Sequence, residues 1–285
     1  MRKMLTEERC RDKLLEVKNL TYLYNEEKEA LKNITLSIYE GERIAVLGAN
    51  GAGKSTLFLN MNGVLTPHEG EIFYRGKKIT GKDLNELRKN IGIVFQEADN
   101  QIIASTVLAE VSFGPMNLKL PSKEVEQRVE EALSYMGISD FKNRPPHYLS
   151  GGEKKRVSIA DIIAMKPEIF IFDEPAASLD PYHTKMLEEV LSRLSEEKKT
   201  LLISTHDVDF AYRFAERVLV FSGGELIADA APLEVFQNQE ILAEANLKTP
   251  VLFQMYEMLK EAGKVSGEGA YPRTVQEFQK LVAGS

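Results

Sequence analysis

The feature that most constrains the fold of this chain is the stretch "GANGAGKST" at residues 48–56, which satisfies the pattern G-x-x-x-x-G-K-[ST]. The apolar run "RIAVL" precedes it and the helical "TLFLNMNG" follows it. Glycines in such a strand-to-helix turn let backbone N–H groups close around phosphates, and the helix N-terminus adds positive potential. The chain is therefore predicted to carry a phosphate-binding loop at the end of a strand.

The residues of this loop have predictable tasks around a nucleotide. We expect Lys54 to reach the β- and γ-phosphates and Ser55 to ligate Mg²⁺. One hydroxyl is sufficient, because Mg²⁺ prefers few protein ligands together with phosphate oxygens and water. The residues predicted to surround the nucleotide are Asn50, Gly51, Ala52, Gly53, Lys54, Ser55 and Thr56.

Two further apolar runs end in polar residues that suit the same site. "EIFIFDE" ends in Asp173 and Glu174, and "TLLIST" leads to His206. Ligands of open α/β sheets bind beyond the carboxyl ends of the strands, so these side chains are expected beside the phosphates. Asp173 suits the Mg²⁺ shell, and Glu174, which an alternating backbone would aim elsewhere, suits polarising an attacking water. Taken alone, His206 fits a polar strand cap as well.

The order of patterns along the chain favours an α/β core. Near-continuous apolar runs are typical of parallel strands buried on both faces, and helical segments alternate with them here. Two of these helices have apolar stripes, formed by Val125, Val129, Leu133 and Met136 and by Leu187, Val190, Leu191 and Leu194. Residues 14–24, 33–43 and 70–79 alternate with period two instead, which predicts an antiparallel layer at the N-terminal edge.

The C-terminal part is predicted to be helical from Ala231 onward. Thr249 and Pro250 fit the cap and first position of one helix. Residues 264–273 fit a linker, and residues 274–284 a last short helix.

Composition narrows the function classes. The chain has 285 residues and a net charge of −7, a sign that does not draw a protein onto nucleic acid. The single cysteine, Cys10, excludes an internal disulfide and fits a reducing compartment. The first residues lack the apolar core of a signal peptide, and no apolar run approaches the about eighteen residues that a membrane span needs. If the chain works at a membrane, we expect it to do so through a partner.

The stretch "LSGGEKKRVSIA" at residues 149–160 allows two interpretations. Ser150 and Glu153 fit a capping box, and the three cations that follow would then form a solvated face. A capping box does not require Gly151 and Gly152, which weaken a first helical turn. The glycines favour a second phosphate-binding turn, because they let a ligand approach the backbone closely.

Taken together, these motifs resemble the ATP-binding cassette (ABC) family. The phosphate loop, "FQEADNQ", "LSGGEKKRVSIA", "FDEP", "SLDP" and "STHD" occur in that family's order and approximate spacing, over about residues 14–230. A finer similarity to energy-coupling factor (ECF) transporter ATPases of the cobalt/nickel type is carried by "VFQEADNQI", "TVLAEVSFGPMNL", "STHDVDF" and "ANLKTPVLFQMYEMLK".

The resemblance implies a fold and a division of the chain. The fold is α/β, an ABC-type nucleotide-binding domain at residues 14–230 with a parallel-sheet core, an N-terminal antiparallel β-layer and a helical subdomain at about 97–165. A small C-terminal helical appendage at 231–285 would stabilise a dimer.

The resemblance also implies roles for single residues in the site. Tyr24 matches the aromatic that stacks on adenine, although a strand aromatic packing on its neighbours is the alternative. Gln96 matches the residue that senses Mg²⁺ and the γ-phosphate and faces the membrane partner. Glu174 matches the general base, and His206 the γ-phosphate contact. The implied Mg²⁺ ligands are Ser55, Gln96 and Asp173.

In this family two cassettes pack head to tail, and each covers ATP bound on the other. Ser150, Gly151 and Gly152 would therefore act in the site of the partner subunit, together with Asp180. Asp180 with the following proline fits a helix cap equally well. The sequence departs from the family at Glu153, where Gln is commoner, and at residues 176–177, where two alanines stand, and neither change touches a catalytic role.

The function implied is ATP hydrolysis that powers import of a transition-metal ion, cobalt before nickel, with a vitamin as the alternative cargo. The implied partners are a second cassette, identical or paralogous, a transmembrane coupling subunit and a substrate-binding membrane component, at the cytoplasmic face of a prokaryotic membrane. No nucleic acid and no direct contact with the cargo are expected.

Two other classes of function fit the sequence less well. A nucleic-acid or chromosome ATPase with the same core usually has a long insertion or two cassettes, whereas fewer than a hundred residues separate the motifs here. A non-catalytic binding module is opposed by intact Lys54, Asp173 and Glu174.

Overall fold

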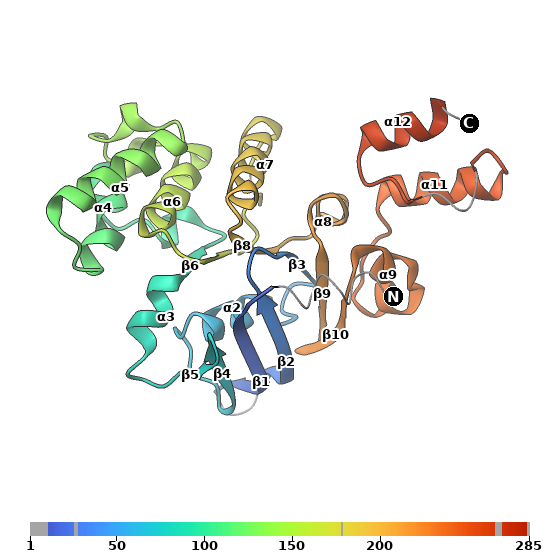
Figure 1. The fold of residues 1–285 in the computed structure, drawn as a ribbon, viewed down its shortest axis with the longest axis horizontal. Coiled ribbons are helices and arrows are strands. Elements are labelled where there is room, and N and C mark those ends of the chain that lie inside the picture. Colours follow the sequence, from blue (N-terminus) through green and yellow to red (C-terminus); the bar gives the residue numbers. More distant parts are fainter. Residues whose placement is uncertain (1–10, 26–27, 178, 266–269, 284–285) are drawn as a thin grey trace.

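Two sheets organise the chain (Figure 1). The computed structural model describes residues 11–25, 28–177, 179–265 and 270–283. Cys10, Ser178 of the "SLDP" motif and the middle of the predicted linker lie outside the described residues.

The smaller sheet is antiparallel and has the order β2-β1-β4-β5. Its alternating strands bury one face, since Ile34, Leu36 and Ile38 of β2 are buried while Thr35 between them is exposed. The antiparallel layer predicted from period-two alternation is thus confirmed. Its strands are β1 (Lys13–Tyr24), β2 (Lys28–Tyr39), β4 (Glu69–Tyr74) and β5 (Lys77–Lys78).

The larger sheet has six strands in the order β10-β9-β3-β8-β7-β6. All its neighbours are parallel except the β9–β10 pair. Every residue of β7 and β8 is buried, because α2 and the smaller sheet cover one face while α6 and α7 cover the other. The strands are β3 (Arg43–Leu47), β6 (Ile91–Val94), β7 (Ile169–Phe172), β8 (Thr200–Ser204), β9 (Arg217–Ser222) and β10 (Glu225–Ala230).

The helices between these strands follow the predicted stripes. Val129 and Leu133 are buried on α5, and the four apolar residues predicted for the later helix are buried on α7. In Figure 1, α4, α5 and α6 gather on one side of the larger sheet. These helices are α2 (Lys54–Met61), α3 (Leu84–Asn90), α4 (Val107–Asn117), α5 (Ser122–Tyr135), α6 (Gly151–Met165), α7 (Pro181–Glu196) and α8 (Val208–Phe214), with short turns η2 (Ala98–Asn100), η3 (Ser139–Phe141) and η4 (Pro146–Tyr148).

The described C-terminal residues after Ala230 form helices and no strand, as predicted. Phe236, Leu242 and Phe253 pack with Tyr212 of α8 and Val220 of β9 in one buried cluster, so the tail is attached to the larger sheet. The helices are α9 (Pro232–Gln237), α10 (Gln239–Glu244), α11 (Val251–Glu261) and α12 (Val275–Ala283). Within the described parts of the chain, none of the helices has the length and apolar character to cross a membrane.

The predicted start of α11 was wrong by one residue. The helix begins at Val251, Pro250 occupies the cap position, and no side chain of the cap residue caps it. The Val251 N–H instead donates to the Asp209 carboxylate of α8 at 2.6 Å. A residue distant in sequence therefore replaces Thr249 as the cap, which local spacing could not reveal.

Candidate nucleotide-binding site

Four neighbouring parallel strands end at one edge of the larger sheet, and each carries a part of the predicted site. The phosphate loop follows β3, His206 follows β8, Asp173 and Glu174 follow β7, and Gln96 follows β6. A cleft of about 190 Å³ at this edge is lined by loop residues 50–56 together with Tyr24, Gln96, Asp173 and Glu174. Of the residues predicted to act on the chain's own nucleotide, His206 alone is absent from the cleft lining, and it lies on the rim against Glu174.

The loop needs glycine at its turn into α2. Gly53 has a φ of 105°, a left-handed conformation that side chains disfavour, and a Cβ atom there would lie 2.5 Å from the Ala30 carbonyl oxygen. Gly51 also has a positive φ, of 79°, but a Cβ there would meet no described residue within 4 Å. Backbone N–H groups on this turn are therefore open to an approaching ligand.

Lys54 is buried under the loop. Its Nζ donates hydrogen bonds to the carbonyl oxygens of Gly48 at 2.7 Å and Ala49 at 3.2 Å, and lies 3.6 Å from Glu174 Oε1. Burial lowers the pKa of Lys54, and the nearby carboxylates of Glu174 and Asp173 oppose that change. The Lys54 ammonium thus lies at the loop, and its N–H groups could donate to phosphate oxygens in place of the two carbonyl oxygens.

Ser204 links the Asp173 carboxylate to the Glu174 backbone, and the sequence did not reveal it. Its Oγ–H donates to Asp173 Oδ1 at 2.6 Å, while the same oxygen accepts the Glu174 N–H at 2.8 Å. Ser204 is fully buried at the end of β8. A polar residue closing an apolar strand was the available signal, but the strand pairing that brings it to Asp173 is not visible in the sequence.

The expected direction of Glu174 was wrong. Strand alternation would aim Glu174 away from Asp173, whereas the residue leaves the extended conformation with a φ of 44° and lines the same cleft. Few non-glycine residues adopt this conformation, and such strain gathers at functional sites. The Ser204 hydrogen bond to its backbone N–H holds it there.

One oxygen of the Glu174 carboxylate lies between His206 and Lys54. Glu174 Oε1 is buried and accepts no well-aligned hydrogen bond from the described residues. His206 Nε2 contacts this oxygen at 2.9 Å but makes its hydrogen bond to Asn50 Oδ1, also at 2.9 Å. The oxygen therefore keeps unused capacity to accept a hydrogen bond.

The residues predicted to bind Mg²⁺ fit that ion. Ser55, Gln96 and Asp173 all line the cleft and offer hydroxyl, amide and carboxylate oxygens, which are the hard ligands that Mg²⁺ prefers. No group of three or more His, Cys, Asp or Glu side chains able to hold a metal occurs in the described ranges. The geometry suits an ion that also needs phosphate oxygens and water.

Tyr24 lines the cleft and also packs on a neighbouring strand aromatic. Its ring packs edge-to-face on Tyr22 with centroids 5.0 Å apart, and its hydroxyl lies 3.4 Å from Thr56 Oγ1. The ring is 40% exposed, so one face remains open to a base. The adenine contact stays a prediction.

The residues predicted to act on the partner's nucleotide form a separate cluster. Ser150, Gly151, Gly152 and Asp180 do not line the cleft. The capping box is confirmed, because the Ser150 N–H donates to Glu153 at 2.8 Å and the Ser150 hydroxyl accepts the Glu153 N–H at 3.4 Å. Asp180 caps α7 by accepting the His183 N–H at 2.8 Å.

The two glycines of this cluster have different surroundings. A Cβ at Gly152 would lie 2.6 Å from Cγ of the His183 ring, so packing against His183 already requires glycine at this position. A Cβ at Gly151 would meet no atom of the described residues within 4 Å. The open space over Gly151 is where another group can reach the start of α6.

The interpretation of Lys154, Lys155 and Arg156 as a solvated face is wrong for Lys155. Lys155 is only 4% exposed, and its Nζ donates to the carbonyl oxygens of Phe95 at 2.8 Å and Gln96 at 2.6 Å. Burial lowers the pKa of Lys155 to about 8, although the carboxylates of Glu97 and Asp173 oppose this. Helix periodicity alone does not show that the loop after β6 covers this side of α6.

Comparison with known proteins decides the family. The model of the ABC transporter family matches residues 31–177, a segment that holds the phosphate loop, the start of α6 and the acidic end of β7. The chain belongs to the ABC transporter family. The predicted fold class and the assignment as an ABC ATPase are thereby confirmed.

Relatives of this ABC ATPase cover most of its length. The energy-coupling factor transporter ATP-binding protein EcfA of Methanothermobacter thermautotrophicus is 45% identical over 95% of this chain and 88% of its own. The structure of cbiO1 from Clostridium perfringens, described as part of the ABC transporter complex cbiONQ, is 42% identical, covers 86% of this chain and 99% of that one, and has a TM-score of 0.72. A dimeric structure of the cassette MJ0796 with ADP and Pi is 33% identical, covers 77% and 99%, and has a TM-score of 0.69.

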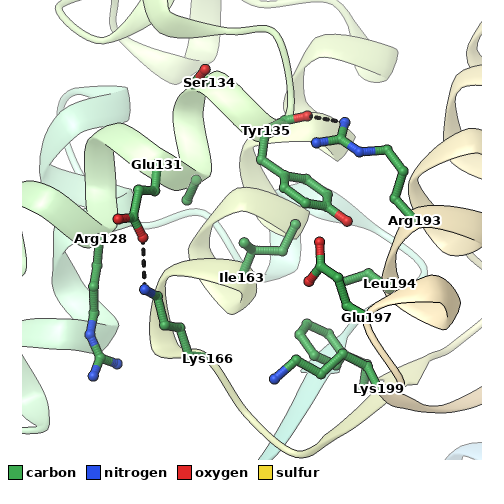
Figure 2. Close-up of a pocket in the computed structure, with 12 residues that line it drawn as sticks. Arg128, Glu131, Ser134, Tyr135, Ile163, Lys166, Arg193, Leu194, Glu197 and Lys199 are labelled. Carbon is green, nitrogen blue, oxygen red and sulfur yellow. Dashed lines mark hydrogen bonds and ion pairs between the residues drawn. The ribbon is translucent and has the colours of Figure 1, made fainter. Parts of the chain in front are cut away.

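A larger cavity of this ABC ATPase, about 560 Å³, lies between α5, α6 and α7 and contains none of the predicted site residues (Figure 2). Cations on its wall already have partners within the chain, since Lys166 pairs with Glu131 at 2.7 Å and Arg193 donates to the Tyr135 carbonyl oxygen at 2.9 Å. The phosphate loop and the carboxylates of Asp173 and Glu174 line the smaller cleft instead.

Proposed function

We propose that this ABC ATPase is the ATP-hydrolysing subunit of an ECF transporter and that it works as a head-to-tail dimer. The observation that carries the proposal is the separation of two half-sites on one chain. The cleft holds the phosphate loop and both carboxylates, whereas the start of α6 lies outside it. The cleft of about 190 Å³ is smaller than the ~300–1,000 Å³ that enclose typical ligands, which supports completion of the site by a second subunit.

Hydrolysis follows from the arrangement of the chain's own residues. ATP phosphates on the loop would take the Lys54 donors that now reach the Gly48 and Ala49 carbonyl oxygens. Mg²⁺ on Ser55, Gln96 and Asp173 would neutralise charge on the phosphates. Glu174 Oε1 would accept a proton from the attacking water.

His206 completes this hydrolytic arrangement. It keeps the Glu174 carboxylate in place and would contact the γ-phosphate.

The start of α6 supplies what the cleft lacks. The first N–H groups of this 15-residue helix and its dipole favour an anion, and Gly151 leaves them uncovered. Placed over a neighbour's γ-phosphate, they would complete that subunit's site together with Asp180. The relative MJ0796 is dimeric in its structure with ADP and Pi, which supports a dimer for this chain.

The partners proposed for this subunit match exposed apolar side chains. Leu108, Phe113 and Met116 on α4 are exposed on the element that follows the Gln96 loop, and we assign this face to the transmembrane coupling subunit. Met255 and Met258 on α11 are also exposed, and we assign the appendage at 231–285 to dimerisation. The subunit would lie at the cytoplasmic face of a prokaryotic membrane.

The cargo is proposed from overall similarity, and cobalt is favoured over nickel. A vitamin importer with the same ATPase is the alternative. The test is transport in proteoliposomes that contain this chain and the membrane components encoded beside it. ATP-dependent uptake of radioactive cobalt supports the metal assignment, whereas uptake of a vitamin without metal uptake overturns it.

A further inference from the structure

Lys155 lies one turn inside α6 and is the lysine of this helix with the most buried side chain. A buried ammonium is costly unless it is hydrogen-bonded, and both of its bonds go to backbone carbonyl oxygens, of Phe95 and Gln96. The chemistry of the phosphate cleft makes no use of this side chain, although it holds the backbone of a proposed Mg²⁺ ligand.

Three other contacts join the same loop to α6, one of them from Gln101 Nε2 to the Asp161 carboxylate at 3.3 Å. Lys154 Nζ pairs with Asp99 at 2.7 Å, and Gln101 Nε2 donates to the Ser158 carbonyl oxygen at 2.8 Å. The segment 95–101 is thus fastened along the first half of α6. Of these contacts, the one from Lys155 reaches residue 96 itself.

We propose that Lys155 is a positioning residue that fixes Gln96 to the start of α6. When residues 150–152 bind the partner subunit's ATP, Lys155 would then shift Gln96 in the nucleotide site of its own chain. Lys155 is five residues from Ser150, about 7.5 Å along a helix. A helix is stiff over that length, so a shift of its N-terminus is passed to Lys155 and then to the Gln96 carbonyl. The inference rests on the proposed function, because it takes Gln96 as a Mg²⁺ ligand and residues 150–152 as acting on the partner's ATP.

The C-terminal end of α6 has different neighbours from its start. Ile163 and Lys166 there border the cavity of about 560 Å³ between α5 and α7 (Figure 2). At the start of α6, the loop 95–101 is held to the helix by the buried Lys155 side chain.

The test compares Lys155→Met with Lys155→Arg in the full chain. Methionine keeps an unbranched apolar body and removes both donors, whereas arginine keeps donors. Because charge-assisted hydrogen bonds are lost, we expect Lys155→Met to lower kcat by about tenfold or more while KM for ATP changes by less than about threefold. The Mg²⁺ concentration for half-maximal activity should rise, the Hill coefficient for ATP should fall towards one, and Lys155→Arg should restore part of each.

Lys166→Met is the matched control, because it removes an exposed ion pair at the other end of the same helix. Thermal denaturation reports folding, and Lys155→Gln replaces Lys155→Met if the latter does not fold. The inference is overturned if both variants match Lys166→Met in kcat, Mg²⁺ midpoint and Hill coefficient, or if Lys155→Met only lowers the melting temperature and arginine rescues nothing. If the wild-type protein releases no phosphate from ATP in the presence of Mg²⁺, the proposed function itself is contradicted.

Discussion

His206 Nε2 lies 2.9 Å from Glu174 Oε1, although the two residues follow different strands, β8 and β7. Both strands are parallel neighbours in the sheet, so their polar ends must meet. Glu174 reaches this position through a left-handed backbone, and His206 is held in turn by Asn50 of the phosphate loop. Loop, base and histidine therefore form one connected arrangement.

Glu174→Gln should bind ATP and lose most turnover. Glutamine keeps the shape of the side chain but cannot accept the proton of the attacking water, and a general base contributes about 10²–10⁴-fold. Phosphate release and equilibrium ATP binding measure the two effects, with exposed Glu86→Gln as the control. Normal phosphate release from Glu174→Gln would remove the assignment of the base.

Ser204→Ala should destabilise the protein and weaken Mg²⁺-dependent activity together. The variant leaves the buried Asp173 oxygen and the Glu174 N–H without their shared partner, which costs about 1–3 kcal/mol. Urea denaturation and a Mg²⁺ titration of ATPase activity measure the two consequences. Ser192→Ala, on the exposed side of α7, is the control, and equal behaviour of the two variants would contradict the role of Ser204.

Asp161→Asn should change how stability depends on pH. Burial raises the pKa of Asp161 on α6 to about 7, so the folded state holds a proton that the unfolded state releases near pH 4. The contribution of this group to the free energy of unfolding is therefore largest below pH 4 and decreases as the pH rises towards 7.

Asparagine stays neutral across that range, so the variant should be more stable than wild type at pH 8, by about 4 kcal/mol at most. Chemical denaturation at pH 5 and pH 8 checks this. A wild-type stability that does not fall relative to Asp161→Asn between these values would contradict the prediction.

Gly151→Ala and Gly152→Ala should have opposite effects on stability. Alanine at Gly152 presses on the His183 ring and should cost about 1–3 kcal/mol, whereas alanine at Gly151 meets no atom of the described part of the chain and should be neutral or slightly stabilising. We expect Gly151→Ala nevertheless to reduce ATPase activity, because the methyl group blocks approach of the partner's nucleotide. Full activity in Gly151→Ala would argue against a ligand at this position.

Local sequence patterns predicted those parts of the fold that neighbouring residues determine. The loop spacing fixed Gly53 and Lys54 at a strand-to-helix turn, and unbroken apolar runs identified β3, β7 and β8 as buried strands. The capping box at Ser150 was also predicted, since its two partners are three residues apart.

The features that the sequence did not reveal depend on contacts between distant residues. Ser204 meets Asp173 only because β7 and β8 pair, and Asp209 caps α11 from a helix 42 residues earlier. Lys155 is buried only because the loop after β6 covers α6. None of these contacts has a periodic pattern, so only the assembled fold identifies them.

The central claim is that each nucleotide site needs two chains, and mixing two inactive variants tests it most directly. Lys54→Ala disables the phosphate loop and Ser150→Arg blocks the start of α6, so each variant alone should be inactive. In a head-to-tail dimer an equal mixture forms one intact site in each mixed pair, and phosphate release should recover to about a quarter of wild type. A mixture as inactive as its components, although mixed dimers are detected by native mass spectrometry, would contradict the shared site.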